Sequence, residues 1–184
     1  MKDFLKDIVI VDFEVTGFDI EKDEPVQIGV LVLDKHSLKE KNRFVAWIKP
    51  VQEIHSELPG FKWATLGAEE IAQINKAPSL QEVAKKVIAL LPETYTFCAW
   101  NASFDFYLWR RMLKTIDKNV QTAGILDLWS LAYPLLLADN GYAGDFKSEP
   151  VFQYFGAEPR TKHDGLEDCE LEAMVLRKLL DKIK

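Results

Sequence analysis

The sequence has few cysteines and no long apolar run, and both absences narrow the class of protein. Cys98 and Cys169 are its only cysteines, and each lies in an apolar pattern typical of a buried thiol. Such a chain is expected in a reduced, cytoplasmic setting. No stretch approaches the length of a transmembrane helix, and acids interrupt the apolar run near the N-terminus, which argues against a signal peptide. We therefore expect no membrane partner.

The sequence also lacks an excess of positive charge, internal repeats and low-complexity segments. Its 23 Lys and Arg face 29 Asp and Glu, for a net charge of −6. This negative net charge argues against electrostatic binding of long duplex DNA over a broad surface. It leaves open a narrow site in which metal ions supply positive charge to a phosphate. The 184 residues suffice for a sizeable core, and we expect a single domain over 1–184.

The order of the expected elements indicates an α/β fold. A strand from Ile8 and strands over 26–34 and 41–49 are joined by short turns, which favours an antiparallel meander. A strand over 95–100 follows a helix capped by Ser79, so it is expected to be parallel to the first. The remaining expected elements are helices at 68–74, 103–115, 129–137, 150–156 and 164–183 and a short strand at 125–128. We predict a five-stranded mixed sheet, with its first three strands antiparallel, then parallel βα units, and helices on both faces.

Asp12 and Glu14 follow four apolar residues that predict a strand buried on both faces. Alternate residues of a strand point to one face, so the two carboxylates project side by side. Close anions repel one another and resist losing water, and a divalent cation relieves both costs. Hard oxygen ligands favour Mg²⁺ or Mn²⁺. A strand that ends in a solvated acidic turn explains this stretch equally well.

Two further polar features lie at the ends of predicted elements. Asp105 falls in the first turn of a helix, where it either complements the helix dipole or joins the acids at the strand ends. Asp168 lies on the expected buried side of the last helix, where an unpaired carboxylate is costly, so a metal or a basic partner is needed. His163 precedes that helix and, taken alone, is a surface or capping residue. Together, four acids and one histidine suit two divalent ions and a general base.

The chain resembles the DEDDh 3′–5′ exonucleases, the superfamily of the proofreading subunit of bacterial replicative polymerases, with a ribonuclease H-like fold. Three motifs carry the resemblance: Asp-x-Glu-x-Thr-Gly at 12–17, Asn-x-x-Phe-Asp at 101–105 and His-x-Ala-x-x-Asp at 163–168. In the last, Gly165 replaces the usual alanine, which removes one methyl group and leaves the acids in place. Each motif alone is weak, but all three in the family's order are highly specific, and they extend over almost the whole chain.

The resemblance implies a role for each matching residue. The expected holders of two Mg²⁺ or Mn²⁺ ions are Asp12, Glu14, Asp105 and Asp168, with His163 as general base. The expected contacts to the terminal nucleotide are Thr16, Gly17 and Phe18, with Asn101 and Phe104 shaping the other side of the cleft. Residues 50–77 lack the family's common His-Gly-Ile loop pattern, and this loop often helps to choose the substrate.

Other charged and aromatic residues are weaker candidates. Arg160 and Lys162 adjoin His163 and either touch a phosphate or remain solvated. Arg110, Arg111 and Lys114 are expected on the exposed face of their helix, where tracking a nucleic-acid backbone is the lesser alternative. The tryptophans expected to be core or semi-buried are Trp47, Trp100, Trp109 and Trp129.

The sequence therefore predicts a metal-dependent 3′–5′ exonuclease that acts on single-stranded DNA or RNA and releases nucleoside 5′-monophosphates. The choice between DNA and RNA, the oligomeric state and any polymerase partner stay open. One alternative is a catalytically silent nucleic-acid-binding module on the same fold. Another is a scaffold protein whose acids merely solvate helix ends, and for that protein Mg²⁺ would not raise the melting temperature.

Overall fold

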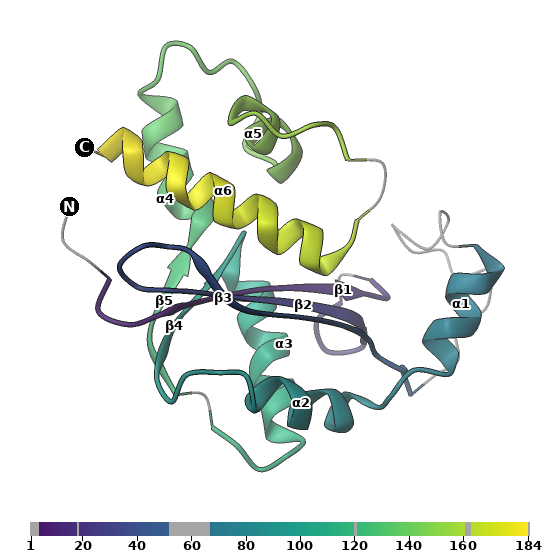
Figure 1. The fold of residues 1–184 in the computed structure, drawn as a ribbon. Helices are drawn as coiled ribbons and strands as arrows, with labels where there is room; N and C mark the ends of the chain where they lie inside the picture. Colours follow the sequence, from purple (N-terminus) through teal and green to yellow (C-terminus); the bar gives the residue numbers. More distant parts are fainter. Residues whose placement is uncertain (1–3, 18, 52–66, 120, 161–162, 184) are drawn as a thin grey trace.

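The computed structural model describes residues 4–17, 19–51, 67–119, 121–160 and 163–183. Five strands form one mixed sheet in the order β3-β2-β1-β4-β5 (Figure 1). The strands are β1 (Ile8–Val15), β2 (Pro25–Leu33), β3 (Glu40–Trp47), β4 (Tyr95–Ala99) and β5 (Thr122–Asp127). β1, β2 and β3 pair antiparallel, whereas β4 pairs parallel with both β1 and β5. The predicted fold class is confirmed.

The central strands are buried because helices cover both faces of the sheet. Every residue of β2 is buried, whereas the edge strand β3 is largely exposed. Alternate residues of β1 contribute to two different cores, since Val9 and Val11 pack on one side and Ile8 and Ile10 on the other. This burial on both faces explains the continuous apolar run at the start of β1.

The helices are α1 (Ala68–Asn75), α2 (Leu80–Ile88), α3 (Ala102–Lys114), α4 (Leu128–Leu137), α5 (Ser148–Tyr154) and α6 (Gly165–Ile183). All the helices except α1 fall into two groups, one on each face of the sheet (Figure 1). α1 lies apart and packs through Ile71 and Ile74 against Val26 and Trp47. α2 and α3 pack under the sheet around Phe97 and Trp109, while α6 lies across the other face with α4 and α5 beside it. The predicted capping box at Ser79 and Glu82 is present.

The predictions for single side chains are met unevenly. Cys98 and Cys169 are buried free thiols, as expected. Trp109 is fully buried, but Trp129 was wrongly placed among the core or semi-buried residues, since it is 38% exposed on α4 and its ring stacks on Tyr133. Its indole Nε1–H reaches the carbonyl of Phe146, and this hydrogen bond holds the ring at the surface. No helix of the described residues is long and apolar enough to cross a membrane.

Candidate active site

The site begins where β1 extends beyond its parallel neighbour. β4 pairs with β1 only as far as Ile10. Beyond Ile10, the N–H groups of β1 that point toward β4 therefore form no hydrogen bonds within the sheet and can bind side chains. The N–H of Phe13 donates to Asp105 Oδ1 at 3.0 Å. This hydrogen bond ties the acid of α3 to the backbone of β1 at the residue between Asp12 and Glu14. Glu14 and Asp105 are each only 6% exposed.

The turn between β4 and α3 positions Asp105. Asn101 has φ 58° and ψ 55°, the left-handed conformation that asparagine tolerates better than most residues, and it starts α3 directly after the strand. The Asp127 carboxylate at the end of β5 accepts from the N–H of Ala102 at 3.2 Å and so ties the helix start to the sheet edge. Asp105 thus reaches the carboxyl ends of the parallel strands, where α/β proteins gather functional groups.

The start of α6 is held against β2 by a close backbone approach. A Cβ added to Gly165 would lie 2.7 Å from the nitrogen of Gly29, and one added to Gly29 would lie 2.1 Å from the Gly165 carbonyl. Gln27, buried in β2, accepts from the N–H of Gly165 at 2.8 Å and donates to the Asp164 carboxylate at 3.1 Å. Asp164 in turn accepts from the N–H groups of Leu166 and Glu167, at 3.1 and 3.3 Å. These contacts set the position of His163 and Asp168.

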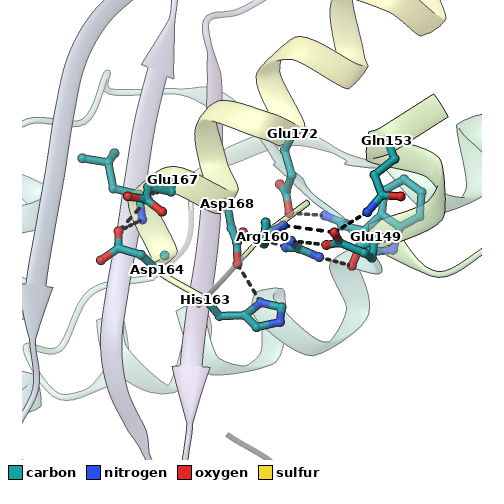
Figure 2. Close-up of polar contacts among 12 residues, drawn as sticks. Glu149, Gln153, Arg160, His163, Asp164, Glu167, Asp168 and Glu172 are labelled. Atoms are coloured by element: carbon teal, nitrogen blue, oxygen red, sulfur yellow. Dashed lines mark hydrogen bonds and ion pairs between the residues drawn. The ribbon is translucent and has the colours of Figure 1, made fainter. Parts of the chain in front are cut away.

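Three ligand-type side chains from β1 and the start of α6 meet at one point. Glu14, His163 and Asp168 each offer an atom, and these atoms all lie within 4.8 Å of one another. His163 Nδ1 lies 3.1 Å from Asp168 Oδ2, so the other ring nitrogen is available to a ligand (Figure 2). The His163 side chain is 37% exposed and Asp168 only 5%, so the histidine lies at the open side of the site.

Arg160 is part of this site. From the sequence, its side chain was expected either to touch a phosphate or to remain solvated. Its Nη1 donates to Asp168 Oδ1 at 2.7 Å and its Nε to Glu149 Oε2 at 2.6 Å (Figure 2). Ser148 Oγ accepts from Nη2 at 3.0 Å, and the guanidinium lies over the Phe152 ring, 5.2 Å from its centroid. The basic partner that the burial of Asp168 requires is therefore Arg160. Only its position three residues before His163 hinted at this contact.

Glu172 is a fifth acid that sequence analysis missed. It lies one helical turn after Asp168 on α6, is 2% exposed, and accepts from the N–H of Trp100 at 3.0 Å through Oε1. Its Oε2 has no hydrogen-bond partner among the described residues. The spacing of four residues from Asp168 was the available signal, because it puts both acids on the buried face of one helix.

Burial and mutual repulsion shift the protonation of these acids. Desolvation, followed by the charges of Asp105 and Glu14, raises the pKa of Asp12 well above its ordinary value. Burial likewise raises the pKa of Glu172, with Asp105 next in importance. Burial works in the same direction on Asp168, but hydrogen bonds and charge from His163 and Arg160 outweigh it and lower the pKa of that carboxyl. The site carries more negative charge than its one arginine offsets.

The residues expected to contact the terminal nucleotide lie around the same strand ends. The Thr16 hydroxyl donates to Asp23 Oδ1 at 2.9 Å and accepts from the N–H of Glu24 at 3.0 Å, so it shapes the turn after β1. A Cβ on Gly17 would lie 2.6 Å from the Asp23 carboxylate. Asn101 is exposed and Phe104 packs partly against the core. Phe18 and most of the 50–77 loop, including His55, Phe61 and Trp63, lie outside the described residues.

The donor set fits a divalent cation. Asp12 Oδ2 is buried and has no hydrogen-bond partner in the described part of the chain, which is costly for a carboxylate unless a cation or a proton compensates. Carboxylate oxygens with a single imidazole and no accessible thiolate suit hard ions such as Mg²⁺ and Mn²⁺. Of the four acids expected to hold metal ions, Glu14 and Asp168 belong to the group of ligand atoms within 4.8 Å, whereas Asp12 and Asp105 do not.

A mixed sheet with acids at its strand ends is an arrangement that suits a metal-dependent nuclease. The sequence profile of the RNase_T exonuclease family matches residues 9–176, so the chain belongs to this exonuclease family. The enzyme class expected from the sequence, a 3′–5′ exonuclease, is thereby confirmed at the level of the family, whose members require divalent metal ions.

Individual relatives agree with this assignment. A "DNA polymerase III PolC-type" of Thermotoga petrophila is 27% identical over 179 residues, which cover 96% of this chain and 12% of that protein. A "3'-5' exonuclease DinG" of Staphylococcus saprophyticus is 26% identical over 128 residues, or 68% of this chain and 13% of that protein. The chain thus spans about an eighth of these relatives.

The nuclease domain of 3'hExo, described as a DEDDh family member bound to rAMP, has the same fold. The two structures superpose with a TM-score of 0.70 at 19% identity, over 98% of this chain and 94% of the other. The ribonuclease H-like fold expected from the motifs is confirmed.

Proposed function

We propose that this chain is a single 3′–5′ exonuclease domain over residues 1–184 that hydrolyses the terminal phosphodiester bond of single-stranded DNA or RNA. The product is a nucleoside 5′-monophosphate. One observation carries the proposal: Glu14, His163 and Asp168 offer ligand atoms within 4.8 Å of one another. The charges of Asp105, Glu14 and Asp168 also act on the Asp12 carboxyl. No other described group of three or more such residues has this geometry.

In this proposal the four acids hold two divalent cations, Mg²⁺ or Mn²⁺. When bound, the ions would supply positive charge to the phosphate oxygens and would make a water molecule more acidic. His163 is the general base, because Asp168 engages Nδ1 and leaves Nε2 to accept the proton of that water. The Asp168 carboxylate, 3.1 Å from Nδ1, holds the ring in orientation.

The neighbouring residues complete a site for a 3′ end. Thr16, Gly17 and Phe18 are proposed to contact the 3′-hydroxyl and the last base, with Asn101 and Phe104 on the opposite side. The rAMP in the related 3'hExo structure supports a nucleotide as ligand. The PolC-type relative supports a polymerase as the protein context. Two buried free thiols are compatible with a reduced, cytoplasmic location.

The direct test uses 5′-labelled single-stranded DNA and RNA of one sequence, incubated with Mn²⁺ or with a chelator. The proposal predicts a ladder that shortens from the 3′ end with Mn²⁺ and no change with chelator. His163→Ala serves as the chemically silent comparison, because it keeps the four acids. Cleavage of wild type and His163→Ala at the same rate would remove the general base from the proposal.

The same assay separates the alternatives. A silent binding module would retain the labelled strand in a binding experiment and leave its length unchanged in Mn²⁺. A scaffold protein would neither bind the strand nor gain thermal stability from the metal. A ladder confined to DNA or to RNA would also assign the substrate class.

A further inference from the structure

One side of α3 carries a groove lined by positive charge. Its volume is about 480 Å³, and the described residues that line it are Tyr107, Arg110, Arg111, Lys114, Lys118 and Asn119. Four of these six side chains are cations and none is an acid, in a chain whose net charge is −6. The local charge is therefore opposite in sign to that of the whole protein, which indicates a polyanionic ligand.

Helix periodicity creates this face. Arg110 and Lys114 follow Tyr107 at spacings of three and seven residues, so they lie on one side of α3. The opposite side, with Leu108, Trp109 and Met112, is buried in the core. Within the described ranges, the side chains of Arg110, Lys114 and Lys118 form neither an ion pair nor a hydrogen bond. These charges are available to a ligand.

The groove is connected to the candidate active site at two points. Asp105 lies in the first turn of α3, and Lys114 lies ~14 Å further along the helix at 1.5 Å per residue. Arg111 donates to the carbonyl of Asp23 at 2.9 Å, and the Asp23 carboxylate in turn accepts from the Thr16 hydroxyl. The turn expected to contact the 3′ end is therefore tied to the wall of the groove.

We infer that this groove binds the phosphodiester backbone of the strand on the 5′ side of the nucleotide being removed. Arg110, Lys114 and Lys118 pair with successive phosphates, and the ring of Tyr107, which is 42% exposed, stacks on a base. This inference rests on the proposed function, since it assumes a 3′ end seated at the acids. It adds that affinity grows with strand length beyond the terminal nucleotides.

The test compares Arg110→Gln/Lys114→Gln with Lys85→Gln/Lys86→Gln, which removes two exposed lysines from the last turn of α2. Binding of a fluorescent 12-nucleotide DNA strand is measured by anisotropy in chelator, over a series of salt concentrations. We expect about tenfold weaker binding for the α3 variant and wild-type affinity for the α2 variant. The slope of log K against log salt should fall by ~0.7 for each lost phosphate contact.

Hydrolysis of a nitrophenyl ester of a single nucleotide, in Mn²⁺, keeps this inference separate from the proposed function. The ester is too short to reach the groove, so wild type and both variants should cleave it equally. If wild type binds the strand but does not cleave the ester, the proposed function is wrong, while the inference that the groove binds the strand is retained. Equal strand binding by the α3 and α2 variants, or displacement of the strand by poly-glutamate as readily as by unlabelled DNA, would overturn the inference.

Discussion

Arg160 and Asp168 form the most buried ion pair among the described residues, with 11% and 5% of their side chains exposed. The guanidinium donates to Asp168 Oδ1 at 2.7 Å, and His163 Nδ1 lies 3.1 Å from Asp168 Oδ2. Because Glu149, Ser148 and Phe152 anchor the arginine independently, it fixes the orientation of the carboxylate. The Oδ2 atom is thereby directed toward the side where His163 and Glu14 meet.

Replacement of Arg160 by methionine should weaken Mn²⁺ binding. The variant keeps an apolar stem against Phe152 but frees Asp168 to rotate, and loss of a hydrogen-bond partner of a metal ligand typically costs ~10- to 100-fold in affinity. Calorimetric titration of the nucleic-acid-free protein measures the change. Arg43→Met is the matched control, since its ion pairs with Glu40 and Glu170 lie at the surface. Unchanged or tighter Mn²⁺ binding by Arg160→Met would refute an orienting role.

Replacement of Gly165 by alanine should destabilise the protein and displace the start of α6. The added methyl would lie 2.7 Å from the backbone nitrogen of Gly29, and a backbone atom has no flexible end that can move aside. Overpacking of this kind costs ~1–3 kcal/mol, which lowers the melting temperature by roughly 2–12 °C for a protein of this size. Thermal unfolding is the measurement. Gly124→Ala is the control, because no heavy atom lies within 4 Å of its added methyl.

Asp12→Asn should stabilise the metal-free protein at neutral pH. Because the folded-state pKa of Asp12 is raised above the ordinary 3.8, the unfolded chain releases its proton first as pH rises. The free energy of unfolding of wild type therefore falls as the pH rises from the unfolded-state pKa to the folded-state pKa of Asp12. Asparagine does not titrate, so the variant does not lose this stability. Melting curves in chelator from pH 4 upward, in steps of about one unit, should converge for wild type and variant at the acidic end. A variant less stable than wild type at pH ~7 would contradict the electrostatic account.

His163→Ala should retain Mn²⁺ binding and lose turnover. The four acids remain in place, while the group proposed to accept the proton is absent, and removal of a general base typically lowers the rate ~10²- to 10⁴-fold. Rates on 5′-labelled strands and Mn²⁺-induced shifts in melting temperature are measured on the same preparation. A variant that no longer gains stability from Mn²⁺ would make His163 a metal ligand instead.

Periodicity and motif spacing predicted most of the fold, because each signal is local. The capping box at Ser79 and the apolar run of β1 depend only on neighbouring residues, and their elements end close to the predicted positions. That Asp12 and Asp105 lie at one edge of the sheet was predictable because the parallel strands β1 and β4 both end there.

Contacts between distant segments were not predictable in the same way. The need for glycine at 165 depends on Gly29, 136 positions earlier. In the sequence, the glycine in place of the family's alanine appeared only to remove one methyl group. The role of Arg160 depends on α5, whose Glu149 and Phe152 hold a side chain that looked solvated. Glu172 matched no motif, although its spacing from Asp168 already placed it on the buried face.

Calorimetric titration of Mn²⁺ into wild type and Asp105→Asn tests most directly whether the converging acids form a metal centre. The account predicts that wild type binds two ions and gains ~2.7 kcal/mol of stability for each ion at a hundredfold excess over its Kd, and that the variant binds fewer or more weakly. Wild-type protein that binds no Mn²⁺, or a variant that binds it as wild type does, would contradict the assignment.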